Sequence, residues 1–338
     1  MKVDGIMMTA GLGSMGERAR GMEALGYDGL ITAETQHNPF LPLTLAAEHT
    51  TALELATGIA VAFARNPMDL ANIGHDLQAF SQGRFILGLG SQIKPHIEKR
   101  FSMPFSHPAA RMREFILALR AIWACWEEDA PLRFEGEFYR HTLMTPFFNP
   151  GPTGFGPPRV FLAAVGEKMT EVAGEVADGM FVHGFTTERY LKETTLPALE
   201  RGLARSGRSR SALELSFPMF MITGDTEAEM AEADAAVRKQ IAFYGSTPAY
   251  RPVLETHGWG DLSDELNTLS KRGEWEEMGR RITDDVLDAF AVAGKPGDLP
   301  ALVEARVGGV VDRITFYAPY RPDPERWGEV VAAFKSAA

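Results

Sequence analysis

The chain has 338 residues, of which 45% are hydrophobic and 23% charged, a composition typical of a folded globular protein and not of a disordered, collagenous or coiled-coil one. Its 34 Lys and Arg against 45 Asp and Glu give a formal net charge of −11, which opposes non-specific binding to nucleic acid or to anionic membranes. A single cysteine, Cys125, excludes an internal disulfide and a CxxC metal motif. With no apolar run of the length of a signal peptide or a membrane span, the sequence predicts a cytoplasmic protein.

The first half of the chain alternates short apolar runs with segments of helical periodicity, as expected for βα units. Four strands are predicted here, over 2–9, 27–33, 56–63 and 84–88. The helices that follow them are predicted over 14–25, over 43–50, from Pro67 onward and over 108–126. The second and third strands are mostly apolar along their length, which is typical of parallel strands covered on both faces.

The second half resumes this alternation after an interruption. Residues 129–158 are rich in Pro and Gly, which predicts a long loop excursion of the kind that often forms a lid. Four more strands are predicted over 159–164, 180–183, 213–222 and 310–316. The helices among them are predicted over 168–177, 187–206, 225–244 and 299–306, and residues from about 245 to 290 are predicted to form a helical insertion.

Eight strands separated by helices favour one α/β domain over residues 1–338, a (β/α)8 TIM barrel with insertions, over a six-stranded doubly wound sheet. In such barrels the chemistry lies on the loops after the carboxyl ends of the strands. Glu34 and His37, which follow the second strand, are therefore candidate catalytic residues. Arg65 and His183 follow two other strands, where each is suited either to a ligand or to ordinary packing.

None of the eight histidines has HxxxH or HExxH spacing, so no metal site is expected. The sharpest short motif is the GxGxxG of residues 11–16, which follows a predicted strand and precedes Glu34 by eighteen residues. This pattern is typical of a Rossmann fold and would indicate an NAD-dependent dehydrogenase. The number of strands argues against it, and a glycine-rich loop equally suits a flat ring that lies against bare backbone.

Several segments, taken together and in order, are similar to the luciferase-like monooxygenase superfamily, which includes bacterial luciferase and deazaflavin-dependent oxidoreductases. These segments are 57–67, 83–92, 163–170 and 177–179. Within the superfamily, 34–37 and 90–92 resemble the branch of oxidoreductases that depend on coenzyme F420. The resemblance implies a bacterial-luciferase-like barrel, a ring held at its mouth, and hydride transfer to or from a small organic substrate.

The resemblance also implies where the cofactor lies. A ring would rest near a bulge around 57–60, often with a non-proline cis peptide, and a phosphate would lie at the start of the helix after the fifth strand. Lys168 would add positive charge there, whereas Glu167 is unfavourable unless it points away. The expected cofactor-binding residues are Thr57, Gly58, Ala60, Gly90, Ser91, Ala164, Val165, Gly166, Glu167, Lys168 and Met169.

The chain departs from the family pattern at one position. Many relatives carry a histidine directly after the acid that ends strand two, where this chain has Thr35, and His37 follows two positions later. We therefore expect Glu34 to contact the ring and either His37 or Glu34 to handle the proton.

Coenzyme F420 is the expected cofactor and FMN is the alternative. FMN would make the protein a monooxygenase that uses reduced flavin and O2. A barrel that binds flavin without catalysis is a further alternative, because the expected base is displaced. We also expect a small-molecule substrate and a homodimer, since homodimers are common among relatives. No nucleic acid or membrane partner is expected.

Overall fold

The computed structural model describes residues 1–7, 12–320 and 323–337, which form two compact units. The larger unit comprises Asp4–Phe181 and Ala198–Glu214. The smaller unit comprises Met1–Val3, Val182–Pro197 and Leu215–Ala338. The first glycine of the GxGxxG motif and the end of the predicted first strand lie outside the described residues.

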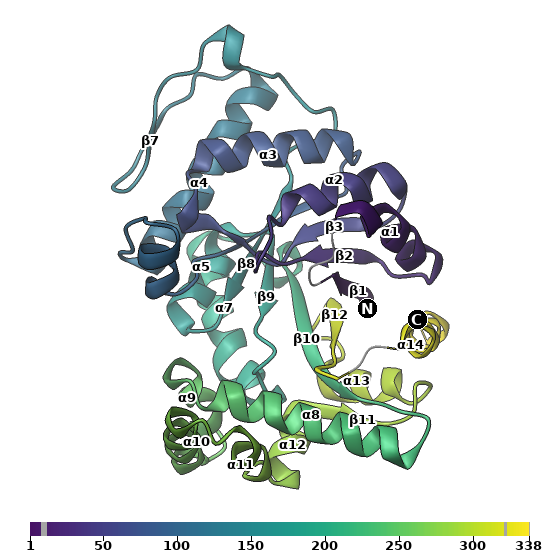
Figure 1. The fold of residues 1–338 in the computed structure, drawn as a ribbon. Helices are drawn as coiled ribbons and strands as arrows, with labels where there is room; N and C mark the ends of the chain where they lie inside the picture. Colours follow the sequence, from purple (N-terminus) through teal and green to yellow (C-terminus); the bar gives the residue numbers. More distant parts are fainter. Residues whose placement is uncertain (8–11, 321–322, 338) are drawn as a thin grey trace. The chain divides into compact units, whose positions relative to one another are not determined.

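The strands of the larger unit run parallel, and their neighbours in the sheet follow chain order (Figure 1). They are β1 (Lys2–Met7, whose first two residues belong to the smaller unit), β2 (Gly29–Thr32), β3 (Glu54–Thr57), β5 (Phe85–Gly90), β8 (Arg159–Ala164) and β9 (Gly179–Val182, whose last residue belongs to the smaller unit). Every residue of β2 and of β5 is buried, as expected for a parallel strand with both faces covered.

Helices of the larger unit alternate with these strands. They are α1 (Met15–Ala24), α2 (Phe40–His49), α3 (Pro67–Phe80), α4 (Pro108–Glu128), α5 (Glu167–Val176) and α7 (Leu196–Arg205, of which the first two residues belong to the smaller unit). Local sequence explains the start of α3: Asn66 caps it by accepting a 3.0 Å hydrogen bond from the Asp69 N–H, and Pro67 occupies the first turn. The apolar face of α4 is buried, as its periodicity predicted.

The third predicted strand, 56–63, differs from the structure. β3 ends at Thr57, the Gly58–Ile59 peptide bond is cis, and the two-residue strand β4 (Ala60–Val61) then pairs with β5. A short 3-10 turn, Ala62–Ala64, follows. Apolar character continues through this segment because it is buried, and so the sequence pattern does not reveal where the strand breaks.

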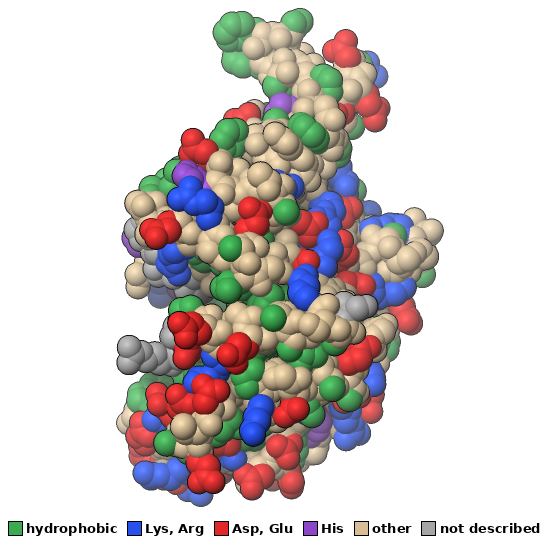
Figure 2. Space-filling view, turned by 90° about the vertical axis from the view of Figure 1, so that its right-hand side faces the viewer, with side chains coloured by type: hydrophobic (Ala, Val, Ile, Leu, Met, Phe, Trp, Pro, Cys, Tyr) green, Lys and Arg blue, Asp and Glu red, His purple; other side chains and the backbone are tan. Residues whose placement is uncertain are grey.

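The excursion at 129–158 contains a small antiparallel hairpin, β6 (Phe134–Glu135) with β7 (Arg140–His141), and projects beyond α3 and α4 (Figure 1). Phe147 and Phe148 pack edge to face on each other, 5.1 Å apart, and both are exposed. Figure 2 shows hydrophobic side chains gathered at the tip of this segment.

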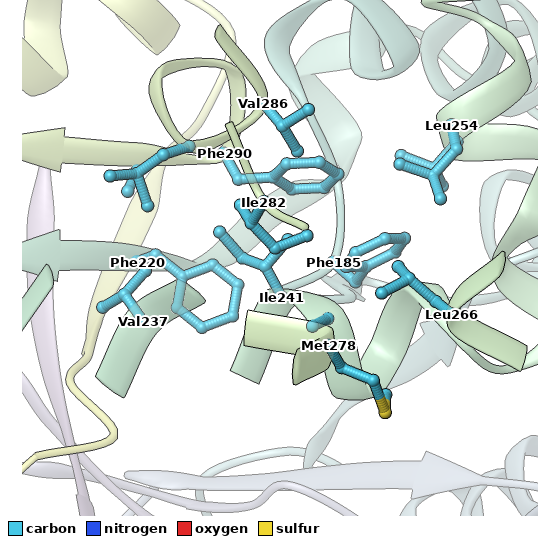
Figure 3. Packing of buried hydrophobic residues seen from close by; sticks show 14 of the residues in the cluster. Phe185, Phe220, Val237, Ile241, Leu254, Leu266, Met278, Ile282, Val286 and Phe290 are labelled. Carbon is cyan, nitrogen blue, oxygen red and sulfur yellow. The ribbon is translucent and has the colours of Figure 1, made fainter. Parts of the chain in front are cut away.

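In the smaller unit, β10 (Glu214–Ile222, whose first residue belongs to the larger unit) pairs in parallel with β11 (Ala291–Ala293) and with β12 (Arg313–Tyr317). Its helices are α6 (Glu188–Tyr190), α8 (Glu227–Gly245), α9 (Arg251–Glu255), α10 (Gly260–Arg272), α11 (Trp275–Arg280), α12 (Asp284–Phe290), α13 (Leu299–Val307) and α14 (Pro324–Ala337). Figure 3 shows the core of this unit, in which Phe185, Phe220, Ile241 and Phe290 are buried. The short strand β11 and the last helix α14 were not predicted.

The strand order is β11-β10-β12-β1-β2-β3-β5-β8-β9, with a helix between successive long strands. This is the order of a (β/α)8 barrel, and the predicted fold is confirmed. The order contains no reversal of the kind that opens a dinucleotide crevice in a doubly wound sheet, and so the Rossmann interpretation of residues 11–16 is wrong. Gly16 has a packing role instead, because a Cβ there would lie 2.7 Å from the ring of His49.

Candidate active site

The carboxylate of Glu34 joins the turn after β2 to β4 and to the segment that follows β4. Arg65 binds it with both terminal nitrogens, at 2.7 Å from Nη1 to Oε2 and 2.8 Å from Nη2 to Oε1. The Val61 N–H donates a further 2.7 Å hydrogen bond to Oε2, and the Glu34 N–H donates to the Ile59 carbonyl. The Glu34 side chain is 7% exposed. Both of its oxygens are therefore engaged in holding the segment that follows the cis peptide.

Around the cis peptide, the backbones of β3 and β5 are in direct contact. Thr57 is fully buried, and its Oγ1 donates to the Gly88 carbonyl at 2.8 Å and accepts from the Gly88 N–H at 2.9 Å. A Cβ at Gly88 would lie 1.8 Å from the Thr57 carbonyl oxygen, so only glycine fits between β3 and β5. The Gly58 N–H donates to the Thr32 carbonyl at 2.7 Å, which ties this turn to β2.

The carboxyl end of β5 continues the same edge of the sheet. Gly90 is the last residue of the strand and pairs with Val61 of β4. Ser91 and Gln92 follow, both half-buried, and Gln92 has a φ of 56°. Ala60, another predicted cofactor-binding residue, is buried in β4 and pairs with Leu89 of β5.

His37 lies on the exposed turn between β2 and α2. The carbonyl of Thr35, at the position where many relatives have a histidine, accepts a hydrogen bond from Arg100. In the same turn Asn38 accepts a 2.8 Å hydrogen bond from the Phe40 N–H at the start of α2. The predicted catalytic pair is thus divided between a buried acid and a solvent-exposed imidazole.

The loop between β8 and α5 contains the predicted phosphate-binding residues. Ala164 is buried at the end of β8, Val165 and Met169 are half-buried, and Gly166, Glu167 and Lys168 are exposed. A Cβ at Gly166 would meet no heavy atom within 4 Å, so the space beside its backbone is open. The Glu167 carboxylate is bound by Arg201 of α7 at 2.6 Å, which directs it toward that helix.

The structure brings nearly all the predicted site residues to one edge of the sheet in the larger unit, because β2, β3, β5 and β8 are parallel neighbours. Sequence reasoning missed the ion pair between Glu34 and Arg65, although both follow predicted strands. It also missed the close approach of β3 and β5 at Gly88. The available signal was a glycine inside an otherwise apolar strand. His183 lies in the smaller unit, where its Nε2 is 3.1 Å from the Tyr250 hydroxyl.

Two further observations concern the described parts of the chain as a whole. Within residues 1–7, 12–320 and 323–337, no three His, Cys, Asp or Glu side chains are grouped so that they could hold a metal ion. In the same residues, no helix is both long enough and apolar enough to cross a bilayer.

Comparison with known proteins adds the family context. Residues 2–313 match the family model of luciferase-like monooxygenases. The uncharacterized protein Rv1360 of Mycobacterium tuberculosis is 60% identical over 314 residues, covering 93% of this chain and 92% of that protein. The 5,10-methylenetetrahydromethanopterin reductase of Archaeoglobus fulgidus is 26% identical over 318 residues, covering 90% of this chain and 89% of that protein.

A solved structure shows the same fold. The coenzyme F420 dependent tetrahydromethanopterin reductase from Methanopyrus kandleri superposes with a TM-score of 0.80 at 20% sequence identity. The match covers 98% of this chain and 97% of that one, so the similarity spans both units.

Proposed function

Because the chain belongs to the luciferase-like monooxygenase family, we propose that it is an oxidoreductase that uses coenzyme F420 to transfer hydride to or from a small organic substrate. The observation that carries this proposal is the open loop at the start of α5, which lies on the same sheet edge as the turn after β3. A bound deazaflavin would supply a ring carbon that accepts or donates hydride and reacts poorly with oxygen.

The residues of the α5 loop fit an anionic cofactor tail. The first N–H groups of a helix have no partner within the helix, and at Gly166 no side chain obstructs access to them. The exposed ammonium of Lys168 adds positive charge in the first turn. Glu167, the unfavourable neighbour, is neutralised by Arg201. The Met169 N–H donates to the Gly166 carbonyl at 3.1 Å, so we assign phosphate binding to the backbone of residues 165–168 and to the side chain of Lys168.

The residues after β2 and β3 would hold the ring. Glu34 fixes the position of Val61 and Arg65, while Thr57 fixes β3 against β5 through Gly88. Gly58, Ala60, Gly90 and Ser91 then form the local backbone on which the ring rests. In this proposal Glu34 and Thr57 act as positioning residues, because their polar atoms are already occupied.

We assign proton transfer in the proposed reaction to the imidazole of His37. Among the two candidate groups it is the exposed one, whereas the carboxylate of Glu34 is bound by Arg65 and Val61. An imidazole is the side chain that most often serves as a general acid or base in enzymes.

FMN is the second candidate cofactor, because the family model that matches this chain is described by monooxygenase activity. The same α5 loop would bind its single phosphate. With FMN, the reduced enzyme would consume O2, whereas with F420 it would not.

The test is titration of the purified protein with F420 and with FMN, followed by anaerobic reduction and exposure to oxygen. We expect saturable binding of F420, with a change in its visible absorbance, and no oxygen consumption above that of free cofactor. Tighter binding of FMN with oxygen consumption would overturn the F420 assignment in favour of the monooxygenase. Binding of either cofactor with no turnover against any of a panel of ketones, aldehydes and enones would favour a non-catalytic flavin-binding protein.

We further propose that the protein is a cytoplasmic homodimer. Light scattering coupled to gel filtration measures its mass in solution, and a value near 37.1 kDa would show a monomer.

A further inference from the structure

The smaller unit contains a cluster of four polar aromatic side chains that the proposed cofactor site does not use. We call His183, Tyr244, Tyr250 and Tyr317 the His–Tyr cluster. His183 directly follows β9 and Tyr317 ends β12, so two members lie where the functional loops of a (β/α)8 barrel begin. Tyr244 lies in the last turn of α8, and Tyr250 ends a short 3-10 turn.

The rings contact one another closely. The His183 ring is stacked on Tyr250, with centroids 4.5 Å apart at an angle of 24°, and Tyr244 meets His183 edge to face at 4.9 Å. The hydroxyls of Tyr244 and Tyr317 lie 2.6 Å apart. All four residues are half-buried, so part of each remains accessible. Tyr244, Tyr250 and Tyr317 pack against the core shown in Figure 3, to which Phe185 belongs.

The hydrogen bonds of His183 have a fixed direction. Its Nδ1 accepts a 3.0 Å hydrogen bond from the Phe185 N–H and so carries no proton. The neutral ring therefore carries its proton on Nε2, which donates to the Tyr250 hydroxyl oxygen at 3.1 Å. The Tyr250 hydroxyl oxygen is thus the acceptor in this hydrogen bond, and the hydroxyl proton of Tyr250 points away from His183. Within the described residues, no acceptor is found for that proton.

His183, Tyr250 and Tyr317 are uncharged near neutral pH. Burial lowers the pKa of His183 to about 4 and raises the pKa of Tyr250 to about 12. Burial also raises the pKa of Tyr317. A charged ligand would lose its hydration here and would meet no opposite charge among these side chains. Its binding would therefore cost desolvation free energy that nothing in the cluster offsets. The cluster instead suits a neutral group with a hydrogen-bond acceptor and a flat apolar body.

We propose that the His–Tyr cluster is a substrate-binding site in which the Tyr250 hydroxyl donates a hydrogen bond to the carbonyl oxygen of a neutral, planar organic substrate. His183 is the positioning residue, because its Nε2–H occupies the Tyr250 oxygen and directs the phenol proton outward. This proposal rests on the proposed function in one respect: the ligand is a substrate only if the protein is an oxidoreductase. Binding itself is testable without any cofactor.

The test uses three probes of nearly the same shape: acetophenone, α-methylstyrene, in which a CH2 group replaces the carbonyl oxygen, and benzoate, which is charged. Binding to the full-length protein is measured by ligand-observed NMR. We expect acetophenone to bind about fivefold more tightly than α-methylstyrene, which is the value of one neutral hydrogen bond. We expect benzoate to bind at least about tenfold more weakly than acetophenone.

In Tyr250→Phe, which keeps the ring and its stacking, we expect acetophenone and α-methylstyrene to bind equally. The matched control is Tyr320→Phe. The Tyr320 hydroxyl is bonded to Met221 and Thr223 and belongs to no part of the cluster, so its loss should leave the fivefold preference intact.

A spectroscopic measurement separates this role from packing. The carbonyl stretch of 13C-labelled acetophenone should shift to lower frequency on binding, and the shift should be lost in Tyr250→Phe but retained in Tyr320→Phe. The proposal is overturned if acetophenone shows no saturable binding, if it binds no better than α-methylstyrene, or if Tyr250→Phe keeps the full shift. None of these outcomes depends on F420 or FMN, so failure here is distinct from failure of the proposed function.

Discussion

The Arg65 guanidinium donates two parallel hydrogen bonds, 2.7 and 2.8 Å long, to the carboxylate of Glu34, which lies 31 residues earlier in the sequence. The Glu34 side chain is 7% exposed and that of Arg65 15% exposed, so the pair is largely removed from water. A bidentate guanidinium–carboxylate pair is both strong and directional, and here it connects the turn after β2 to the segment after β4.

Removal of one partner of this pair should be costly. Arg65→Met leaves the buried Glu34 carboxylate without its counter-charge, and we expect the free energy of unfolding to fall by about 3 to 5 kcal/mol. Denaturant unfolding measures it. The matched control is Arg140→Met, which breaks an exposed pair with Glu135 and should cost about 1 kcal/mol or less. Equal losses in the two variants would contradict the assigned importance of the buried pair.

Gly88 should tolerate no side chain. In Gly88→Ala the new Cβ would lie 1.8 Å from the Thr57 carbonyl oxygen, and β3 and β5 would have to separate. We expect a loss of about 3 kcal/mol or more in the free energy of unfolding, or no soluble protein. Gly166→Ala, where the new methyl meets nothing within 4 Å, should unfold like the wild type. A Gly88→Ala protein of wild-type stability would show that the strands can separate without cost.

Lys168 should contribute to cofactor affinity. Lys168→Gln removes one positive charge from the first turn of α5, and we expect the dissociation constants of F420 and FMN to rise about three- to tenfold. Fluorescence titration at low and high salt measures this, and the difference should shrink as salt screens the charge. Lys94→Gln, an exposed lysine paired with Glu98, serves as the control and should leave the affinity unchanged.

His37 should affect the rate and not the binding of cofactor. We expect His37→Asn to lower the rate of hydride transfer about 100-fold or more, because the proton would have to come from solvent. Stopped-flow absorbance of the loaded enzyme, with a ketone or enone substrate identified by turnover, measures that rate. His96→Asn, another exposed histidine, should have no effect. An unchanged rate in His37→Asn would remove this residue from the mechanism.

Acid should destabilise the protein in part through His183. A histidine in an unfolded chain titrates near pH 6.5, whereas burial lowers the pKa of His183 to about 4. Folding thus favours the neutral ring, and this stabilisation is complete above pH 6.5 and is lost as the pH falls from 6.5 to 4. Tyr244 and Tyr250 face the ring, and burial raises the pKa of Tyr250 to about 12, so Tyr250 remains neutral across this window.

The slope from His183 is at most about 1.4 kcal/mol per pH unit, and the total is about 3 kcal/mol or less because solvent reaches part of the ring. His183→Asn keeps a side-chain acceptor for the Phe185 N–H and removes the titration. Denaturant unfolding of both proteins between pH 4 and 7 measures the difference. A constant difference across that range would contradict the lowered pKa.

Much of the fold could be predicted because its signals are local. The period-2 and period-3.6 patterns located the long strands, and the turn residues between them marked the boundaries. Prediction failed where a mostly apolar segment contains two conformations. Residues 56–63 are mostly apolar, yet β3 ends at Thr57 and the backbone turns through a cis peptide. The GxGxxG motif failed for another reason, since a short glycine pattern does not specify the strand order around it.

By itself, the sequence determined the long parallel strands and their alternation with helices, because those properties depend on neighbours within a few positions. Only the tertiary structure decided that Glu34 would meet Arg65, and that residues 183, 244, 250 and 317 would meet as one cluster. Such contacts depend on strand pairing and on packing between distant segments, and the spacing of residues along the chain does not constrain them.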